Sequence, residues 1–245
     1  MASLISGSAV AQAAGPDHDR TFDLARQSVR ELNRFLHRGL TDGGVRHVTV
    51  QNPDGAHSVA VGVDATIDID VEGHVGYYAG GMNKQADITV HGNAGPGVAE
   101  NMMSGRVHVK GFASVSAGAS GHGGLLVIDG DASLRCGISM KGIDIVVGGS
   151  VGDYSAFMAQ AGHMVVCGDA GDGLGDSLYE AVLYVRGQVK SLGADAHEEV
   201  MTDADLATVK RLLGEAGLNH DPHEFMRIAS MRSLYHWNAD ANQEY

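Results

Sequence analysis

The feature that most constrains this chain is a glycine that returns every 19 residues. It occurs seven times with no insertion between occurrences, at Gly73, Gly92, Gly111, Gly130, Gly149, Gly168 and Gly187. A fixed period of this kind indicates a repeat architecture, in which each repeat is one structural unit stacked on the next.

The residues before each glycine predict a short β-strand. Two positions before it the residue is always β-branched, as at Val71 and Ile128, and four positions before it the residue is always apolar. Apolar residues at alternate positions are typical of a strand with one buried face. A strand this short must stack on its neighbours to bury a core. Glycine at the following corner supplies either a positive φ or room for close backbone approach.

We therefore predict an all-β fold, a right-handed parallel β-helix of seven 19-residue turns with short helical N- and C-terminal extensions. At about 4.8 Å per turn, the rod would be about 30 Å long. An antiparallel sandwich is disfavoured, because hairpin loops rarely keep one length seven times. The composition agrees, since 35 of the 245 residues are glycine and aromatic residues make up only 5%.

The flanks predict two caps around a β-helix domain at residues 45–195. Residues 1–44 would form an N-terminal arm with an amphipathic helix over 20–38. The β-helix would open with a hairpin of strands 45–50 and 58–63, joined by the turn Asn52-Pro-Asp-Gly55.

Residues 196–245 would form a C-terminal helix and an extended tail. Asp203 is the expected helix cap and Gly217 the expected stop. The tail carries Tyr235 and Trp237 and has no clear periodicity.

An apolar stripe stands three positions before the later repeat glycines. This outer stripe follows three polar turns and consists of Val127, Val146, Val165 and Tyr184. Apolar side chains on an outward position should be covered. The cover is either the C-terminal helix or another chain, which makes the stripe a candidate docking surface. Val146→Asp would unfold the chain in the first case and release a partner in the second.

Charge and hydropathy exclude several classes of function. The net charge of -13 argues against a nucleic-acid partner, which needs clustered Lys and Arg. No apolar run approaches the ~18 residues of a membrane span. The first ten residues lack the basic region of a signal peptide, so we expect a cytoplasmic protein.

The sequence predicts no catalytic, cofactor-binding or metal-binding residue on this chain. Cys136 and Cys167 have no CxxC spacing and no evident base partner. Of the thirteen histidines, His74, His91, His108 and His163 fall in different columns of the repeat, so stacking does not bring them together. The glycine-rich segments 118–124 and 171–175 do not join a strand to a helix, as a dinucleotide site requires.

Two segments carry a resemblance to a known family. They are Gly76-Tyr-Tyr-Ala-Gly-Gly-Met82 and the more specific stretch from Asp172 to Gly187. Together with the repeat they resemble the GXGXG family, the β-helical third domain of the glutamate synthase large subunit, over roughly residues 45–200. The stretches 189–195 and 229–238 are similar to one branch of that family, the free-standing β-helix subunit of N-methylglutamate synthase (methylamine–glutamate N-methyltransferase).

The resemblance implies a structural subunit of a divided glutamate synthase. In such a complex a flavin-barrel subunit holds FMN, another subunit resembles a glutamine amidotransferase, and the β-helix keeps the two in register. The implied reaction converts methylamine and L-glutamate to N-methyl-L-glutamate and ammonia. This chain lacks the nucleophilic N-terminal cysteine, the flavin barrel and the cysteine cluster of full-length glutamate synthase, so partners must supply them.

Two other functions stay open. The β-helix subunit of a formylmethanofuran dehydrogenase or formyltransferase complex shares the fold, although the segment 176–179 and the C-terminal residues argue against it. An autonomous β-helix enzyme or binding module would need an aromatic or carboxylate cleft along the rod, which the low aromatic content disfavours.

Overall fold

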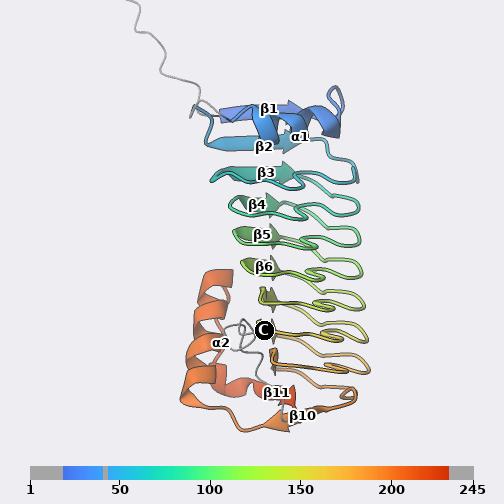
Figure 1. Ribbon diagram of the computed structural model, residues 1–245, viewed down its shortest axis with the longest axis vertical. Coiled ribbons are helices and arrows are strands. Elements are labelled where there is room, and N and C mark those ends of the chain that lie inside the picture. Colours follow the sequence, from blue (N-terminus) through green and yellow to red (C-terminus); the bar gives the residue numbers. More distant parts are fainter. Residues whose placement is uncertain (1–18, 41–43, 232–245) are drawn as a thin grey trace, which may run out of the picture.

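The computed structural model describes residues 19–40 and 44–231, which form a rod of stacked coils (Figure 1). One helix lies at the N-terminal end, and a second lies beside the C-terminal half of the rod. The strands are β1 (Asp19–Asp23), β2 (His47–Gln51), β3 (Asp68–Glu72), β4 (Asp87–Val90), β5 (Arg106–Val109), β6 (Leu125–Ile128), β7 (Asp144–Val147), β8 (His163–Val166), β9 (Val182–Val185), β10 (Ala196–Glu199) and β11 (Met226–Ser230). The helices are α1 (Val29–Arg38), α2 (Asp203–Ala216) and the short 3-10 helix η1 (Pro222–Glu224).

The repeat sets the strand register directly. From β3 to β9 neighbouring strands are parallel, and each residue pairs with the residue 19 positions later, as Ile88 does with Val107. The sheet order is β1-β2-β3-β4-β5-β6-β7-β8-β9-β11-β10. The predicted parallel stack of 19-residue turns is thus confirmed as a β-solenoid. In the described part of the chain, no helix is long and apolar enough to cross a membrane.

The core is the interior of the coil, where side chains stack in columns. The column four positions before the repeat glycine is fully buried from Ile69 to Leu183. On the far side of the corner, small apolar residues form a second parallel line of bridges, Val75↔Ala94↔Ala113↔Ala132↔Val151↔Ala170↔Val189. Because every turn buries the same positions, the core continues along the whole rod.

The repeat glycines are needed for close backbone approach. The N–H of Gly111 donates to the Gly92 carbonyl at 3.0 Å, and the next four corners repeat this bond up to Gly187. A Cβ at Gly149 would lie 2.9 Å from the Gly130 carbonyl carbon and 2.2 Å from an Asp131 carboxylate oxygen. Of the seven, only Gly73 has a positive φ. Stacked corners leave no space for a side chain.

A side-chain ladder ties neighbouring corners together. Except at Phe112, the position after the repeat glycine carries a polar side chain, and most of these accept from the backbone N–H of the same position in the next turn. Asp131 accepts from Ser150 at 2.8 Å, Ser150 from Asp169 at 2.9 Å, and Asp169 from Gln188 at 2.8 Å. These bonds satisfy N–H groups that the strand hydrogen bonds do not reach.

The N-terminal cap differs from the sequence prediction. Residues 19–23, at the start of the expected helix, form β1, which pairs in parallel with β2 and buries Phe22. The helix begins only at Val29, because Ser28 and Glu31 form a capping box. Strand β1 therefore covers an edge of β2 that would otherwise be exposed.

The predicted opening hairpin is wrong. Only its first strand forms, as β2, and residues 58–63 are turns with left-handed backbone at Ser58, Ala60 and Gly62. Both edges of β2 are occupied by parallel strands, β1 and β3, so β2 has no free edge for a hairpin partner.

The C-terminal cap reverses the chain. The backbone passes through β10 into α2, which Thr202 rather than Asp203 caps and which ends at Gly217 with φ 74°. It then returns as β11, which lies antiparallel between β9 and β10. Part of the expected extended tail is thus a strand of the sheet, whereas Tyr235 and Trp237 lie outside the described residues.

The outer stripe is not a free docking surface, because α2 covers it. Val127, Val146 and Val165 are fully buried, and Tyr184 is 1% exposed. They form one cluster with Val209, Leu212, Leu213 and Ala216 of α2 and with Phe225. Hydrophobic burial inside the chain explains the stripe, so the docking hypothesis for these residues is corrected.

The stacked corners predict opposite effects for two glycine-to-alanine changes. Gly149→Ala should destabilise the chain by about 1–3 kcal/mol, because its Cβ would meet backbone and carboxylate atoms. Gly214→Ala should be neutral or stabilise by up to about 1 kcal/mol, because it lies in α2 with no atom near the new Cβ. Urea unfolding of both variants measures this, and equal midpoints would contradict it.

The covered stripe makes a second prediction. Val146→Asp should destabilise by roughly 3–5 kcal/mol and detach α2, because it buries an unpaired charge. Thr89→Asp is the matched control, since Thr89 occupies the same outward position in β4, is partly exposed and is not covered by α2. Thermal unfolding by circular dichroism compares the two. A stable Val146→Asp chain would mean that α2 does not cover the stripe in solution.

Candidate functional site

The outward face of the sheet has two halves of different chemistry. Over β6–β9 it is apolar and lies under α2. Over β2–β5 it is uncovered and polar, with a hollow lined by His47, Asp68, Ile69, Asp70, Asp87, Thr89 and Arg106. We call this second half the polar face. The candidate sites are therefore the polar face, the polar contacts under α2, a hollow in the N-terminal cap, and the cysteines.

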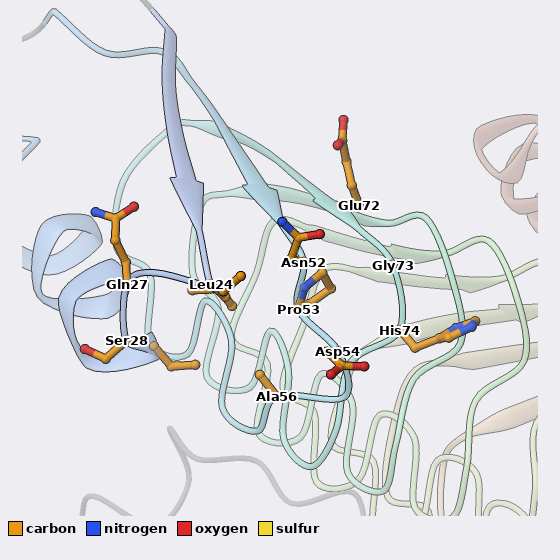
Figure 2. Close-up of a pocket in the computed structure, with 12 residues that line it drawn as sticks. Leu24, Gln27, Ser28, Asn52, Pro53, Asp54, Ala56, Glu72, Gly73 and His74 are labelled. Atoms are coloured by element: carbon orange, nitrogen blue, oxygen red, sulfur yellow. The ribbon is translucent and has the colours of Figure 1, made fainter.

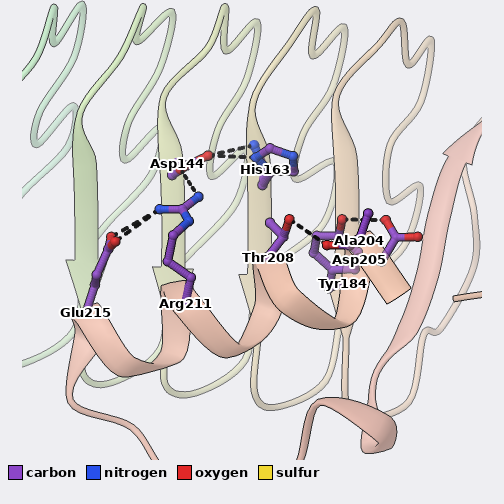
Figure 3. Close-up of polar contacts among 8 residues, drawn as sticks. All are labelled: Asp144, His163, Tyr184, Ala204, Asp205, Thr208, Arg211 and Glu215. Atoms are coloured by element: carbon purple, nitrogen blue, oxygen red, sulfur yellow. Dashed lines mark hydrogen bonds and ion pairs between the residues drawn. The ribbon is translucent and has the colours of Figure 1, made fainter. Parts of the chain in front are cut away.

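Under α2, Asp144 holds the helix against the sheet (Figure 3). It accepts from His163 Nδ1 at 2.9 Å and pairs with Arg211 Nη2 at 3.1 Å. Arg211 also pairs with Glu215 at 3.2 Å on the same helix. Burial by itself would raise the pKa of Asp144, but the hydrogen bonds from His163 and Arg211 outweigh it and lower that pKa. The carboxylate therefore stays ionised.

A second contact joins α2 to β9 and β11. The Tyr184 hydroxyl donates to Asp205 at 2.7 Å, and Arg227 Nε lies 3.1 Å from the same carboxylate oxygen. Thr202 donates to the other oxygen at 2.5 Å. Burial and the hydrogen bond to Asp205 raise the pKa of the Tyr184 hydroxyl, so it remains a donor. These groups satisfy one another and act in folding.

On the polar face, Asp70 lies between two histidines. His47 Nε2 is 2.8 Å from one carboxylate oxygen and His91 Nε2 is 2.5 Å from the other. Burial tends to raise the pKa of Asp70, but the two histidine hydrogen bonds lower it overall. The repeat placed these histidines in different columns. The contact was missed because the side chains reach diagonally across strands β2, β3 and β4.

His108 marks the border between the polar face and the covered half. Its Nε2 donates to Asp129 at 2.6 Å, and its Nδ1 accepts from Arg106 Nη2 at 3.0 Å, which assigns the tautomer. Burial is the main reason that the pKa of His108 is lowered. Arg106 also reaches the Glu215 carbonyl at 3.4 Å, beside the end of α2.

The carboxyl groups of the polar face are held in their ionised form. A carboxyl group that acts as a general acid at neutral pH needs a raised pKa. Every described carboxyl whose pKa is clearly shifted has it lowered, as at Asp70 and Asp144. In the described ranges, no three His, Cys, Asp or Glu side chains are grouped to hold a metal ion.

A hollow in the N-terminal cap lies between the turn before α1 and the corners of β2 and β3 (Figure 2). Its lining includes Leu24, Ser28, Pro53, Glu72 and His74. Figure 2 shows Glu72 pointing away from His74 and Asp54, so the three ionisable side chains of the lining do not converge on one point. The hollow therefore offers no catalytic constellation.

Neither cysteine is placed to act as a nucleophile. Cys136 is fully buried, and burial raises the pKa of its thiol to about 12. Cys167 is 4% exposed, and burial raises its pKa to about 11. A reactive cysteine needs a lowered pKa and access to solvent. Both thiols instead pack as small apolar side chains.

Comparison with known proteins gives one informative relative. Protein GlxC of Rhizobium meliloti (strain 1021) is 56% identical to this chain over 224 residues. The aligned region covers 91% of this chain and 98% of GlxC. No family model matches the chain, and no solved structure matches it. The likeness therefore spans the solenoid and both caps.

The contacts under α2 predict acid sensitivity. Because the pKa values of Asp144 and Asp205 are lowered on folding, their stabilisation is complete above the unfolded value of about 3.9 and is lost as pH falls through the lower folded values. We expect the urea midpoint to fall progressively from about pH 5 downward. The double variant Asp144→Asn and Asp205→Asn should be less stable at pH 7 but should lose less stability on acidification.

Asp87→Asn is the control for that measurement. Asp87 occupies the same position in its turn as Asp144 but lies on the polar face, away from α2. The urea midpoint of the Asp87→Asn chain should fall with decreasing pH in the same way as that of the unmodified chain. If the urea midpoint of the double variant also falls with pH as in the unmodified chain, Asp144 and Asp205 are not the cause of the acid sensitivity.

Proposed function

The chain belongs to the family of protein GlxC, and from that membership we propose that it is a non-catalytic structural subunit of a glutamate-synthase-related enzyme complex. The finer form of the proposal is the β-helix subunit of N-methylglutamate synthase. That complex would convert methylamine and L-glutamate to N-methyl-L-glutamate and ammonia.

The observation that carries the proposal is the 56% identity with protein GlxC over 91% of this chain, and the two segments that resemble glutamate synthase agree with it. Residues 76–82 and residues 171–177, which include the start of the segment 172–187, form the same loop of the coil, five turns apart. In each loop the third, fifth and seventh residues have left-handed backbone, namely Tyr78, Gly80, Met82, Gly173, Gly175 and Ser177. The loops between them repeat these left-handed positions, as at Gly97, Ala99 and Asn101, so the two segments share the regular loop conformation of the coil.

The geometry supports a structural role. The interior of the coil is filled with aliphatic side chains, and the polar clusters on its surface are mutually satisfied pairs such as His163–Asp144. A rigid rod with many turns offers long faces on which other subunits can dock in fixed register. We propose that a flavin-barrel subunit carrying FMN and an amidotransferase-like subunit dock in this way.

The test is to purify the tagged chain from its own cells under gentle conditions. We expect two co-purifying subunits, a flavin absorption spectrum, and N-methylglutamate formation from methylamine and L-glutamate. The control is the Val146→Asp chain, which should be destabilised with α2 detached and should bring down less of both subunits.

Other results would exclude the proposal. Co-purifying molybdenum-containing or formyl-transferring subunits would favour the formylmethanofuran type of complex instead. A colourless chain that is recovered alone would contradict a structural subunit and favour an autonomous binding module.

A further inference from the structure

The loops opposite the sheet carry most of the exposed apolar surface of the described chain. These loops, between each corner and the following strand, stack along the rod as what we call the loop face (Figure 1). Its large apolar side chains that are exposed to solvent are Tyr77, Tyr78, Met82, Met103, Leu134, Tyr154, Met158, Tyr179 and Leu192. Apolar side chains gathered on one face of a soluble protein mark a contact surface.

Several of these side chains stand at backbone positions that cost stability. Tyr154 has φ 56° and Met158 has φ 53°, both in the left-handed region. A side chain with a Cβ pays roughly 1–2 kcal/mol there, which glycine does not. Other turns hold Gly173 at the first of these positions and Ser139 at the second. Folding alone therefore does not require a tyrosine and a methionine.

Contacts within the chain offset only part of this backbone strain. The Tyr154 ring lies along the rod over Gly173 of the next turn, where an added Cβ would be 2.8 Å from the ring. Even so, Tyr154 remains 48% exposed and Met158 remains 40% exposed. Strained positions that hold large exposed side chains are typical of functional surfaces.

Carboxylates surround these two side chains. The N–H of Tyr154 donates to the Asp172 carbonyl at 2.7 Å, and that of Met158 donates to the Asp176 carbonyl at 2.8 Å. Asp172 is paired with Lys190 at 2.5 Å. In the described part of the chain, Asp153 and Asp176 accept only neutral donors, the Asp172 N–H and the Ser177 hydroxyl. Arg135 and Lys190 also lie at this end of the loop face, but Asp153, Asp172 and Asp176 outnumber them, so the surroundings of the apolar side chains are net negative.

We propose that Leu134, Tyr154 and Met158, with Asp153 and Asp176 around them, form the docking patch for a partner subunit whose own surface is apolar and bordered by Lys and Arg. The inference rests on the proposed function, because it names the surface by which the structural subunit holds a partner. Aromatic and Met side chains supply the buried centre of such an interface, and opposite charges at its rim supply orientation and a fast encounter.

The same charges disfavour a second copy of this chain as the occupant. A two-fold contact would place the docking patch against itself, with Asp153 and Asp176 of both copies close together. The net charge of -13 adds a general repulsion between copies. A basic-rimmed partner removes both penalties.

The test uses residues that the chain itself places at these positions. The double variant Tyr154→Gly and Met158→Ser replaces each side chain with the one found at the same position of a neighbouring turn, Gly173 and Ser139. The thermal midpoint of the chain should therefore change little. Tagged chains replace the natural one in its own cells, and co-purified partner subunits are identified and quantified by mass spectrometry. We expect the double variant to co-purify with one partner subunit in an amount at least roughly tenfold lower than the unmodified chain does.

Charge variants test the rim of the patch. Asp153→Asn with Asp176→Asn should weaken assembly and make the remaining binding less sensitive to salt. Arg135→Gly is the matched control, because Arg135 occupies the left-handed position of Tyr154 one turn earlier and carries the opposite charge. Loss of that positive charge should leave binding of a basic-rimmed partner unchanged or tighter.

The outcomes separate this inference from the proposed function. If the unmodified chain and the folded double variant retain the same glutamate-synthase-like partners equally, the docking patch is refuted and the proposed function stands. If the double variant loses partners of another class, the patch stands and the proposed function fails. An unmodified chain recovered without partners refutes both. A dimer of the isolated chain that the double variant converts to a monomer overturns the partner in favour of a second copy.

Discussion

The structure depends on how closely the backbones of successive corners approach one another. From Gly111 to Gly187 each corner glycine N–H donates to the carbonyl of the glycine one turn before, and a Cβ at these corners would meet the preceding backbone. A 19-residue coil can therefore stack on the next only if its corner has no side chain. Once this contact is set, strand register, the aliphatic interior columns and the polar corner ladder follow, because each is a repeat of the same geometry.

The two ends of the rod show how a solenoid protects its edges. Strand β1 covers β2, and β11 returns antiparallel beside β9, so long parallel edges are not left open. Helix α2 serves a different purpose, since it buries the outer stripe and is held in place by Asp144 and Asp205. The repeat is polar on its outward face where nothing covers it and apolar where the chain folds back.

The loop face differs from both ends, because some of its large side chains occupy strained backbone positions although folding does not require them there. Most turns place glycine, alanine or serine at the left-handed positions, which keeps the loop compact at little cost. Tyr78, Met82, Tyr154 and Met158 depart from that pattern while remaining substantially exposed. In a chain whose polar clusters are internally satisfied and whose cysteines are buried, such departures are the strongest signs of function. They are the basis of the docking patch proposed above.

Much of the fold could be predicted from the sequence, because a period of 19 residues is visible without any knowledge of distant contacts. The repeat glycines, the β-branched strand positions, the small apolar column and helix α2 ending at Gly217 were all predictable in this way.

Only the tertiary structure decided the rest. Residues 19–23 and 226–230 are strands because sheet edges were available to pair with them, and the segment 58–63 is not a strand because β2 had no free edge. Val146 could be read as a docking or a core residue until the position of α2 was known. The pairing of His47 and His91 through Asp70 depends on diagonal reach between strands, which a column-by-column comparison does not contain. Local periodicity can be detected in the sequence itself. The pairing of strand edges, the covering of the outer stripe by α2 and the diagonal side-chain contacts arise only when distant segments meet in space.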